Sequence, residues 1–134
     1  MSKIKHVKGR QVFDSRGNPT VEAEIILEND LMGSSIVPSG ASTGSYEAHE
    51  LRDNNKDYLN KSVFDAVNNI NNKISKILKN KNSTNQKEID EILISLDGTD
   101  NKSNIGANAI LAVSVANLKV SAKLANKEIY KYIN

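Results

Sequence analysis

The chain has 134 residues, of which 38% are hydrophobic and 25% charged, and these values fit one globular domain with an aliphatic core. Its 18 basic and 16 acidic residues are interspersed and leave a net charge of only +2, which argues against nucleic-acid binding. The absence of cysteine excludes disulfide bonds, thiolate catalysis and cysteine-ligated zinc sites.

The amino-terminal sequence is charged throughout and has no apolar stretch typical of a secretion signal. The longest apolar run, residues 107–116, is interrupted by Asn108 and Ser114 and is too short to span a membrane. We therefore expect a soluble, cytoplasmic protein without a membrane span.

Turn-forming residues separate the first predicted strand from the second. Residues 3–13 indicate an irregular strand, and five of the six residues that follow (Asp14, Ser15, Gly17, Asn18 and Pro19) are common in turns. Within that turn, Gly17 or Asn18 can adopt a positive φ. We therefore expect the chain to reverse direction here.

The next segment, residues 20–28, alternates between apolar and polar side chains. Its apolar members are expected on a buried face, and Thr20 and three glutamates are expected on the other face. A turn at Asn29 and Asp30 and a return strand over residues 31–37 complete a meander. The strands must be antiparallel, because their connections are too short for a parallel crossover.

After residue 45 the period of the apolar residues changes from two residues to about 3.6 residues, which predicts a layer of helices. Residues 46–52 are long enough for one or two helical turns. Ser62 and Asp65 form a capping-box pattern, and one apolar stripe then runs as far as Ile77.

Two longer helices are predicted next. Asn85 and Glu88 indicate the start of one helix, and Gly98 indicates its end. The other helix begins near Gly106 and is apolar on more than one face, so we expect it at the centre of the domain. Asn126 is expected to end it in the left-handed conformation.

Residues 128–134 predict the start of a further helix. Strands that precede helices are typical of an α+β fold. The sequence therefore predicts a three-stranded antiparallel meander followed by a layer of about four helices.

The loop at residues 38–44 combines two glycines and three hydroxyl side chains with no charged residue. Such a loop can open and close over a ligand while presenting oxygen atoms and backbone N–H groups. It can equally be an exposed linker of small residues, and the residues alone leave both interpretations open. It is not a phosphate-binding P-loop, because the required lysine and spacing are absent.

Other candidates for chemistry are weaker. His6 and His49 are far apart and are expected at the surface, and Asp14 is expected to hydrogen-bond the turn that follows it. The acidic residues between positions 88 and 100 are better explained by a solvated helix face and by capping than by a metal site. The Ser42 hydroxyl is a hard oxygen donor that suits Mg²⁺, but one hydroxyl cannot hold the ion alone.

Several segments resemble the enolase family in their order and spacing, over essentially the whole chain. They are Arg10 and residues 14–22 (DSRGNPTVE), 37–44 (VPSGASTG), 47–48 (EA), 50–53 (ELRD), 96–99 (LDGT), 101–103 (NKS) and 106–114 (GANAILAVS). Each segment is a weak signal, and together they are very specific.

The resemblance implies that residues 1–134 are the N-terminal capping domain of an enolase, or phosphopyruvate hydratase. This glycolytic lyase interconverts 2-phosphoglycerate and phosphoenolpyruvate plus water, with two Mg²⁺ ions in each active site. In the family, the lysine base, the glutamate acid and the carboxylate metal ligands belong to a C-terminal β/α barrel, which this chain does not contain. We therefore expect no catalytic residue in this chain and no activity from it alone.

The resemblance also implies roles for individual residues. Ser42 matches the serine that binds the second Mg²⁺ when the loop closes over substrate. The rest of that lid is matched by Ser39, Gly40, Ala41, Thr43 and Gly44. Arg10 and Glu22 match charged residues at the interface of family dimers, whose partners lie in the barrel of the other subunit. The implied assembly is a homodimer or a higher oligomer.

The sequence leaves two alternatives to a domain of a complete enzyme. One is a non-enzymatic, stand-alone interaction domain that is derived from enolase and has lost the barrel. The other is a phosphate-binding module that acts through residues 39–44.

Overall fold

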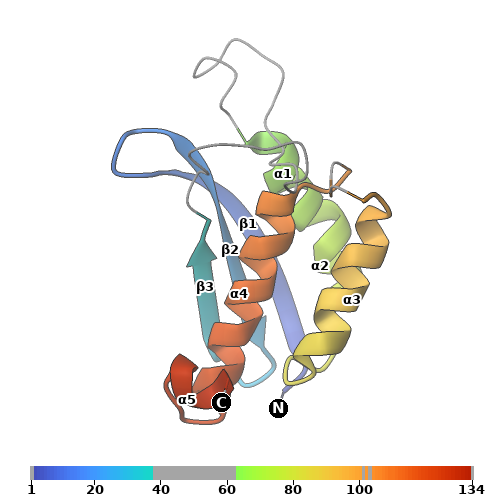
Figure 1. Ribbon diagram of the computed structural model, residues 1–134. Coiled ribbons are helices and arrows are strands. Elements are labelled where there is room, and N and C mark those ends of the chain that lie inside the picture. Colours follow the sequence, from blue (N-terminus) through green and yellow to red (C-terminus); the bar gives the residue numbers. More distant parts are fainter. Residues whose placement is uncertain (1, 38–62, 101, 103, 134) are drawn as a thin grey trace.

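The computed structural model describes residues 2–37, 63–100, 102 and 104–133 (Figure 1). A three-stranded sheet comes first and helices follow, as the sequence predicts. The elements are β1 (Ile4–Phe13), β2 (Pro19–Leu27), β3 (Met32–Ile36), α1 (Phe64–Asn69), the π-helix η2 (Ile70–Ile74), α2 (Ser75–Leu78), α3 (Gln86–Asp97), α4 (Ala107–Leu124) and α5 (Ile129–Ile133). Figure 1 shows α4 lying across the sheet, with α1, α2 and α3 beside it. The α+β prediction is confirmed.

The sheet is an antiparallel meander in the order β1-β2-β3. The first strand is irregular, as expected, because its register with β2 shifts between Ile4 and His6. In the turn after β1, Gly17 adopts a φ of +79°, and Asp30 adopts a φ of +68° in the turn after β2. Both reversals were predicted from their turn-forming residues.

The alternation along β2 separates a buried face from a more exposed one. Val21, Ala23, Ile25 and Leu27 are fully buried, whereas Glu22 and Glu24 are half-buried on the opposite face. The expectation is wrong for Thr20, which is only 2% exposed. The Thr20 hydroxyl donates a hydrogen bond to the carbonyl oxygen of Val37, and this partner permits its burial.

Strand β3 turns two of its small residues, Gly33 and Ser35, toward the helices. Gly33 and Ser35 are buried, whereas Met32 and Ile36 are exposed on the other face of the sheet. A Cβ atom on Gly33 would lie only 2.6 Å from the backbone nitrogen of Val120 in α4. Glycine therefore permits the close approach of α4 to β3.

The segment from α1 through η2 to α2 is one continuous helical run with a wide turn in its middle. Ile70 and Ile74 are buried as predicted, but Ile77 is 37% exposed and Leu78 is buried in its place. A π-turn contains more residues than an α-turn, so it shifts the buried stripe by one position. Ser62 of the expected capping box and the predicted helix at 46–52 lie outside the described residues.

The ends of α3 and α4 follow the sequence predictions. Asn85 Oδ1 accepts a hydrogen bond from the Glu88 N–H, and Gly98 ends α3 with a φ of +73°. Helix α4 begins directly after Gly106 and is buried on several sides. Asn126 adopts a φ of +56° just beyond its end. In the part of the chain that the structure describes, no helix has the length and apolar character needed to cross a membrane.

Candidate functional site

The predicted lid does not fall within the described residues. Ser42 and its neighbours Ser39, Gly40, Ala41, Thr43 and Gly44 all belong to segment 38–62, as does His49. Their roles stay predictions. The structure does place the two predicted interface residues and the residues on either side of that segment.

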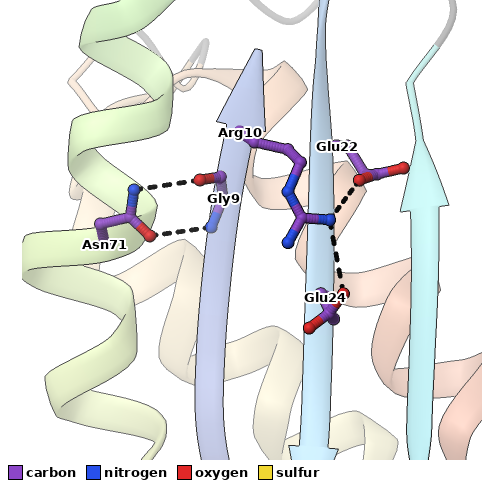
Figure 2. A network of polar contacts seen from close by, with 5 residues as sticks. All are labelled: Gly9, Arg10, Glu22, Glu24 and Asn71. Carbon is purple, nitrogen blue, oxygen red and sulfur yellow. Dashed lines mark hydrogen bonds and ion pairs between the residues drawn. The ribbon is translucent and has the colours of Figure 1, made fainter. Parts of the chain in front are cut away.

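Arg10 on β1 and Glu22 on β2 are cross-strand partners. The Arg10 guanidinium nitrogen Nη1 lies 2.5 Å from Glu22 Oε1 and 3.4 Å from Glu24 Oε2 (Figure 2). The hydrogen bond to Glu22 is the main cause that raises the pKa of Arg10, with a further contribution from the charge of Glu24. The structure thus brings the two predicted residues together within one chain and adds Glu24 to them.

This charged group can take part in further contacts. The Arg10 side chain is 45% exposed, and one guanidinium is shared between two carboxylates, so the three side chains carry a net charge of −1. Lys8 lies opposite Glu24 in the strand register. Partly exposed ion pairs contribute little to stability, about 0–1 kcal/mol, and act mainly on the choice of partner.

Apolar side chains adjoin these charges on the sheet face that the helices leave open. Ile36 pairs with Glu22 across β2 and β3 and is 51% exposed. Met32 is 45% exposed and pairs with the half-buried Ile26. Exposed apolar side chains beside charges are typical of protein–protein contact surfaces. His6 is exposed on β1 opposite Ile26, which agrees with its expected surface position.

Gly9, the residue before Arg10, is hydrogen-bonded by the side chain of Asn71 from the helical layer. Sequence reasoning missed this contact. Asn71 Oδ1 accepts a hydrogen bond from the Gly9 N–H at 2.8 Å, and Asn71 Nδ2 donates to the Gly9 carbonyl oxygen at 3.1 Å (Figure 2). A Cβ on Gly9 would lie 2.9 Å from Ile70 Cβ. A glycine inside a strand pattern is a signal of such close approach, but it does not identify the partner.

The described residues that flank segment 38–62 are each anchored to the sheet. The Val37 N–H donates to the Val21 carbonyl oxygen at 3.0 Å, and the Val37 carbonyl accepts from the Thr20 hydroxyl. On the other side, the Val63 N–H donates to Gln11 Oε1 at 2.9 Å. Sequence reasoning missed both Thr20 and Gln11, because nothing in their neighbourhood in the sequence indicates these partners.

Asp97 organises the loop between α3 and α4. Its carboxylate is buried and accepts hydrogen bonds from the hydroxyl and N–H of Thr99 and from the Ile105 N–H. Burial by itself would raise the pKa of Asp97, but these hydrogen bonds outweigh it and hold the pKa below its usual value.

The other acidic residues of this region also serve the helices. Asp90 accepts from the Ser114 hydroxyl at 2.6 Å, and Glu88 pairs with Asn85 at the start of α3. These contacts agree with the expected capping and structural roles. Across residues 2–37, 63–100, 102 and 104–133, no three His, Cys, Asp or Glu residues come together in a group that could hold a metal ion.

Comparison with known proteins identifies the family. The family model described as "Enolase, N-terminal domain" matches residues 4–133. A protein named "Enolase" from Pelagibacter ubique (strain HTCC1062) is 61% identical over 132 residues, which cover 98% of this chain and 31% of that protein. The chain thus spans about a third of the length of this curated relative. With the three-stranded meander and the helices that follow it, these matches show that the chain belongs to the enolase family, in the part described by its N-terminal domain.

Proposed function

We propose that this chain is the lid-bearing domain of an enzyme that interconverts 2-phosphoglycerate and phosphoenolpyruvate plus water. The observation that carries the proposal is the family match over residues 4–133 together with 61% identity to a protein named "Enolase". Because the chain spans 31% of that relative, the activity is proposed for a complete protein that contains this domain. Its place would be in glycolysis, in the cytoplasm.

In this proposal the loop at residues 39–44 closes over the substrate, and Ser42 supplies oxygen ligands to the second of two Mg²⁺ ions. The chemistry of the donors fits, since hydroxyl and carbonyl oxygens are hard ligands that Mg²⁺ accepts. When bound, Mg²⁺ would stabilise the negative charge of the ene-diolate. As the family resemblance implies, the remaining ligands would be carboxylates in the barrel of the complete enzyme.

We also propose that Arg10 and Glu22 belong to the interface of a homodimer. Three features of the structure support this role. The Arg10 side chain is 45% exposed, its ion pairs hold it on the open face of the sheet, and the exposed Ile36 pairs with Glu22 across the next two strands. The Arg10–Glu22 pair within the chain would present both charges in a defined geometry to a second subunit.

The loop proposal is tested with Ser42→Ala in the complete protein, with Ser45→Ala as a matched control just beyond the matched loop. We expect Ser42→Ala to lower kcat roughly tenfold or more while circular dichroism stays unchanged, because the lost ligand acts in the closed, metal-loaded state. Ser45→Ala should resemble the wild type. Turnover and Mg²⁺ dependence that are unchanged in Ser42→Ala would show that the ligand role is wrong.

The proposal also predicts that the 134-residue chain has no dehydratase activity by itself. The assay follows the ultraviolet absorbance of phosphoenolpyruvate above a control without protein. Activity from the chain alone would contradict the assignment of the base and the acid to another part of the complete enzyme.

A further inference from the structure

We infer that Thr20 and Gln11 are positioning residues, which tie the two described residues that flank segment 38–62 to adjacent strands of the sheet. The flanking residues are Val37 and Val63. The inference rests on the proposed function, in which that segment carries Ser42. Thr20 and Gln11 do not touch substrate or metal in this proposal. They hold Val37 and Val63, the described residues directly before and after the segment that contains Ser42.

The first anchor holds both polar backbone groups of Val37. Its N–H donates to the Val21 carbonyl oxygen at 3.0 Å, and its carbonyl oxygen accepts from the Thr20 hydroxyl. Thr20 is 2% exposed and Val37 is 7% exposed, so water is a poor substitute for either partner. Pro38 follows and has no N–H to extend the ladder. The Thr20 bond therefore holds Val37, the last described residue before segment 38–62.

The second anchor holds the start of the helical layer. The Val63 N–H, directly before α1, donates to Gln11 Oε1 at 2.9 Å, and Val63 is fully buried. A backbone N–H at the start of a helix has no partner within the helix. Here a side chain from β1 satisfies it and ties the first turn of α1 to the sheet.

The two anchors are neighbours in the sheet. Gln11 pairs with Val21, and Thr20 is the residue directly before Val21. Paired residues of antiparallel strands have Cα atoms about 4.5–5.5 Å apart. The two described residues that flank the segment, Val37 and Val63, are thus tied to neighbouring positions on the paired strands β2 and β1. A metal ligand on such a segment depends on these points, because a displacement of about 1 Å can cost about 100-fold in rate.

A matched pair of substitutions in the complete protein tests the first anchor. Thr20→Val keeps the shape of the side chain and removes the hydroxyl, whereas Thr20→Ser keeps the hydroxyl. We expect Thr20→Val to lower kcat roughly tenfold and to raise the Mg²⁺ concentration for half-maximal activity, and Thr20→Ser to restore both. Ile25→Val, a core substitution on the same strand, should leave the Mg²⁺ dependence unchanged.

The second anchor has a readout that needs no activity. Gln11→Met removes the acceptor for the Val63 N–H, and Gln11→Glu keeps one. We expect faster hydrogen exchange at the start of α1 in Gln11→Met, measured by mass spectrometry on the complete protein, and exchange near the wild-type rate in Gln11→Glu. The hydrogen-exchange experiment on the Gln11 variants also decides the inference if Thr20→Val fails to fold.

The outcomes separate the inference from the proposed function. Suppose that Ser42→Ala is impaired but Thr20→Val has the kcat and the Mg²⁺ dependence of the wild type. This result would overturn the positioning role and leave the proposed function standing. An unimpaired Ser42→Ala would instead overturn the proposed ligand role of Ser42, and the exchange experiment would then decide the anchoring. Wild-type exchange in Gln11→Met would overturn the anchoring in either case.

Discussion

The carboxylate of Asp97, the last residue of α3, accepts a hydrogen bond from the Ile105 N–H at 2.6 Å, two residues before α4 begins. The same side chain also holds Thr99. One buried anion therefore joins the end of one helix, the connecting loop and the start of the next helix. A negative charge at this place also suits the positive end of the α4 dipole.

Replacement of Asp97 should therefore destabilise the fold. We expect Asp97→Asn to lower the free energy of unfolding by about 1–3 kcal/mol, because the buried Ile105 N–H and the part-buried Thr99 N–H lose a charged acceptor. Urea denaturation followed by circular dichroism measures the change. Asp100→Asn, at an exposed position of the same loop, is the control and should stay within about 0.5 kcal/mol of the wild type. Equal stabilities for the two variants would contradict this role of Asp97.

The lowered pKa of Asp97 also predicts a pH dependence of stability. An aspartate in an unfolded chain titrates at about pH 3.9. Above that pH the carboxylate is charged in both the folded and the unfolded state and stabilises the fold fully. Below it the unfolded chain takes up a proton first, and the stabilisation is lost as the pH falls through the lower folded-state pKa. Urea denaturation at a series of acidic pH values should therefore show a steeper loss of stability in the wild type than in Asp97→Asn.

Asp14 is a second aspartate whose lowered pKa contributes to the pH dependence of stability. Hydrogen bonds from the backbone, chiefly that of Asn18, lower its pKa as well. Because Asp14 is present in both proteins, its contribution cancels in the comparison. Parallel pH profiles for the wild type and Asp97→Asn would contradict the assignment.

Gly33 should not tolerate a side chain. In Gly33→Ala the new Cβ would lie 2.6 Å from Val120 N and 2.8 Å from the Ala116 carbonyl oxygen, both of which belong to the backbone of α4. We expect a loss of about 1–3 kcal/mol, because β3 and α4 must move apart. Thermal denaturation measures it against Ser34→Ala, an exposed neighbour on the same strand. A melting temperature equal to that of Ser34→Ala would show that the contact can relax without cost.

The charged group on the open sheet face predicts an effect on assembly. In the complete protein we expect Arg10→Ala to weaken the proposed homodimer roughly tenfold, since Glu22 and Glu24 would then present two uncompensated charges. Analytical ultracentrifugation at several salt concentrations measures the dissociation constant. Lys3→Ala removes a charge from an exposed position directly before β1 and serves as the control. An unchanged dissociation constant for Arg10→Ala would exclude Arg10 from the interface.

The apolar pattern predicted one buried residue wrongly in the helical run from α1 to α2. The stripe predicted through Ile77 holds as far as Ile74, and then Leu78 becomes buried instead. The π-turn between Ile70 and Ile74 causes the shift, and the apolar spacing alone does not reveal it. The extra residue is accommodated where Asn71 meets Gly9 of the edge strand, so a distant contact accompanies the local irregularity.

The sequence by itself determined what depends on a few neighbouring residues. The alternation along β2, the Asn85 cap and the positive φ angles of Gly98 and Asn126 were all predictable, because periodicity and backbone preference act over one or two turns. The family motifs were equally readable, since they depend on residue order alone.

Only the tertiary structure decided the polar partners. Thr20 reaches Val37 across 17 positions, and Gln11 reaches Val63 across 52. The alternation had predicted Thr20 on the exposed face, whereas Thr20 is buried and its hydrogen bond to Val37 permits that burial. A polar side chain can enter the interior wherever folding brings it a partner, and that partner is set by the packing of the whole domain rather than by its neighbours in the chain.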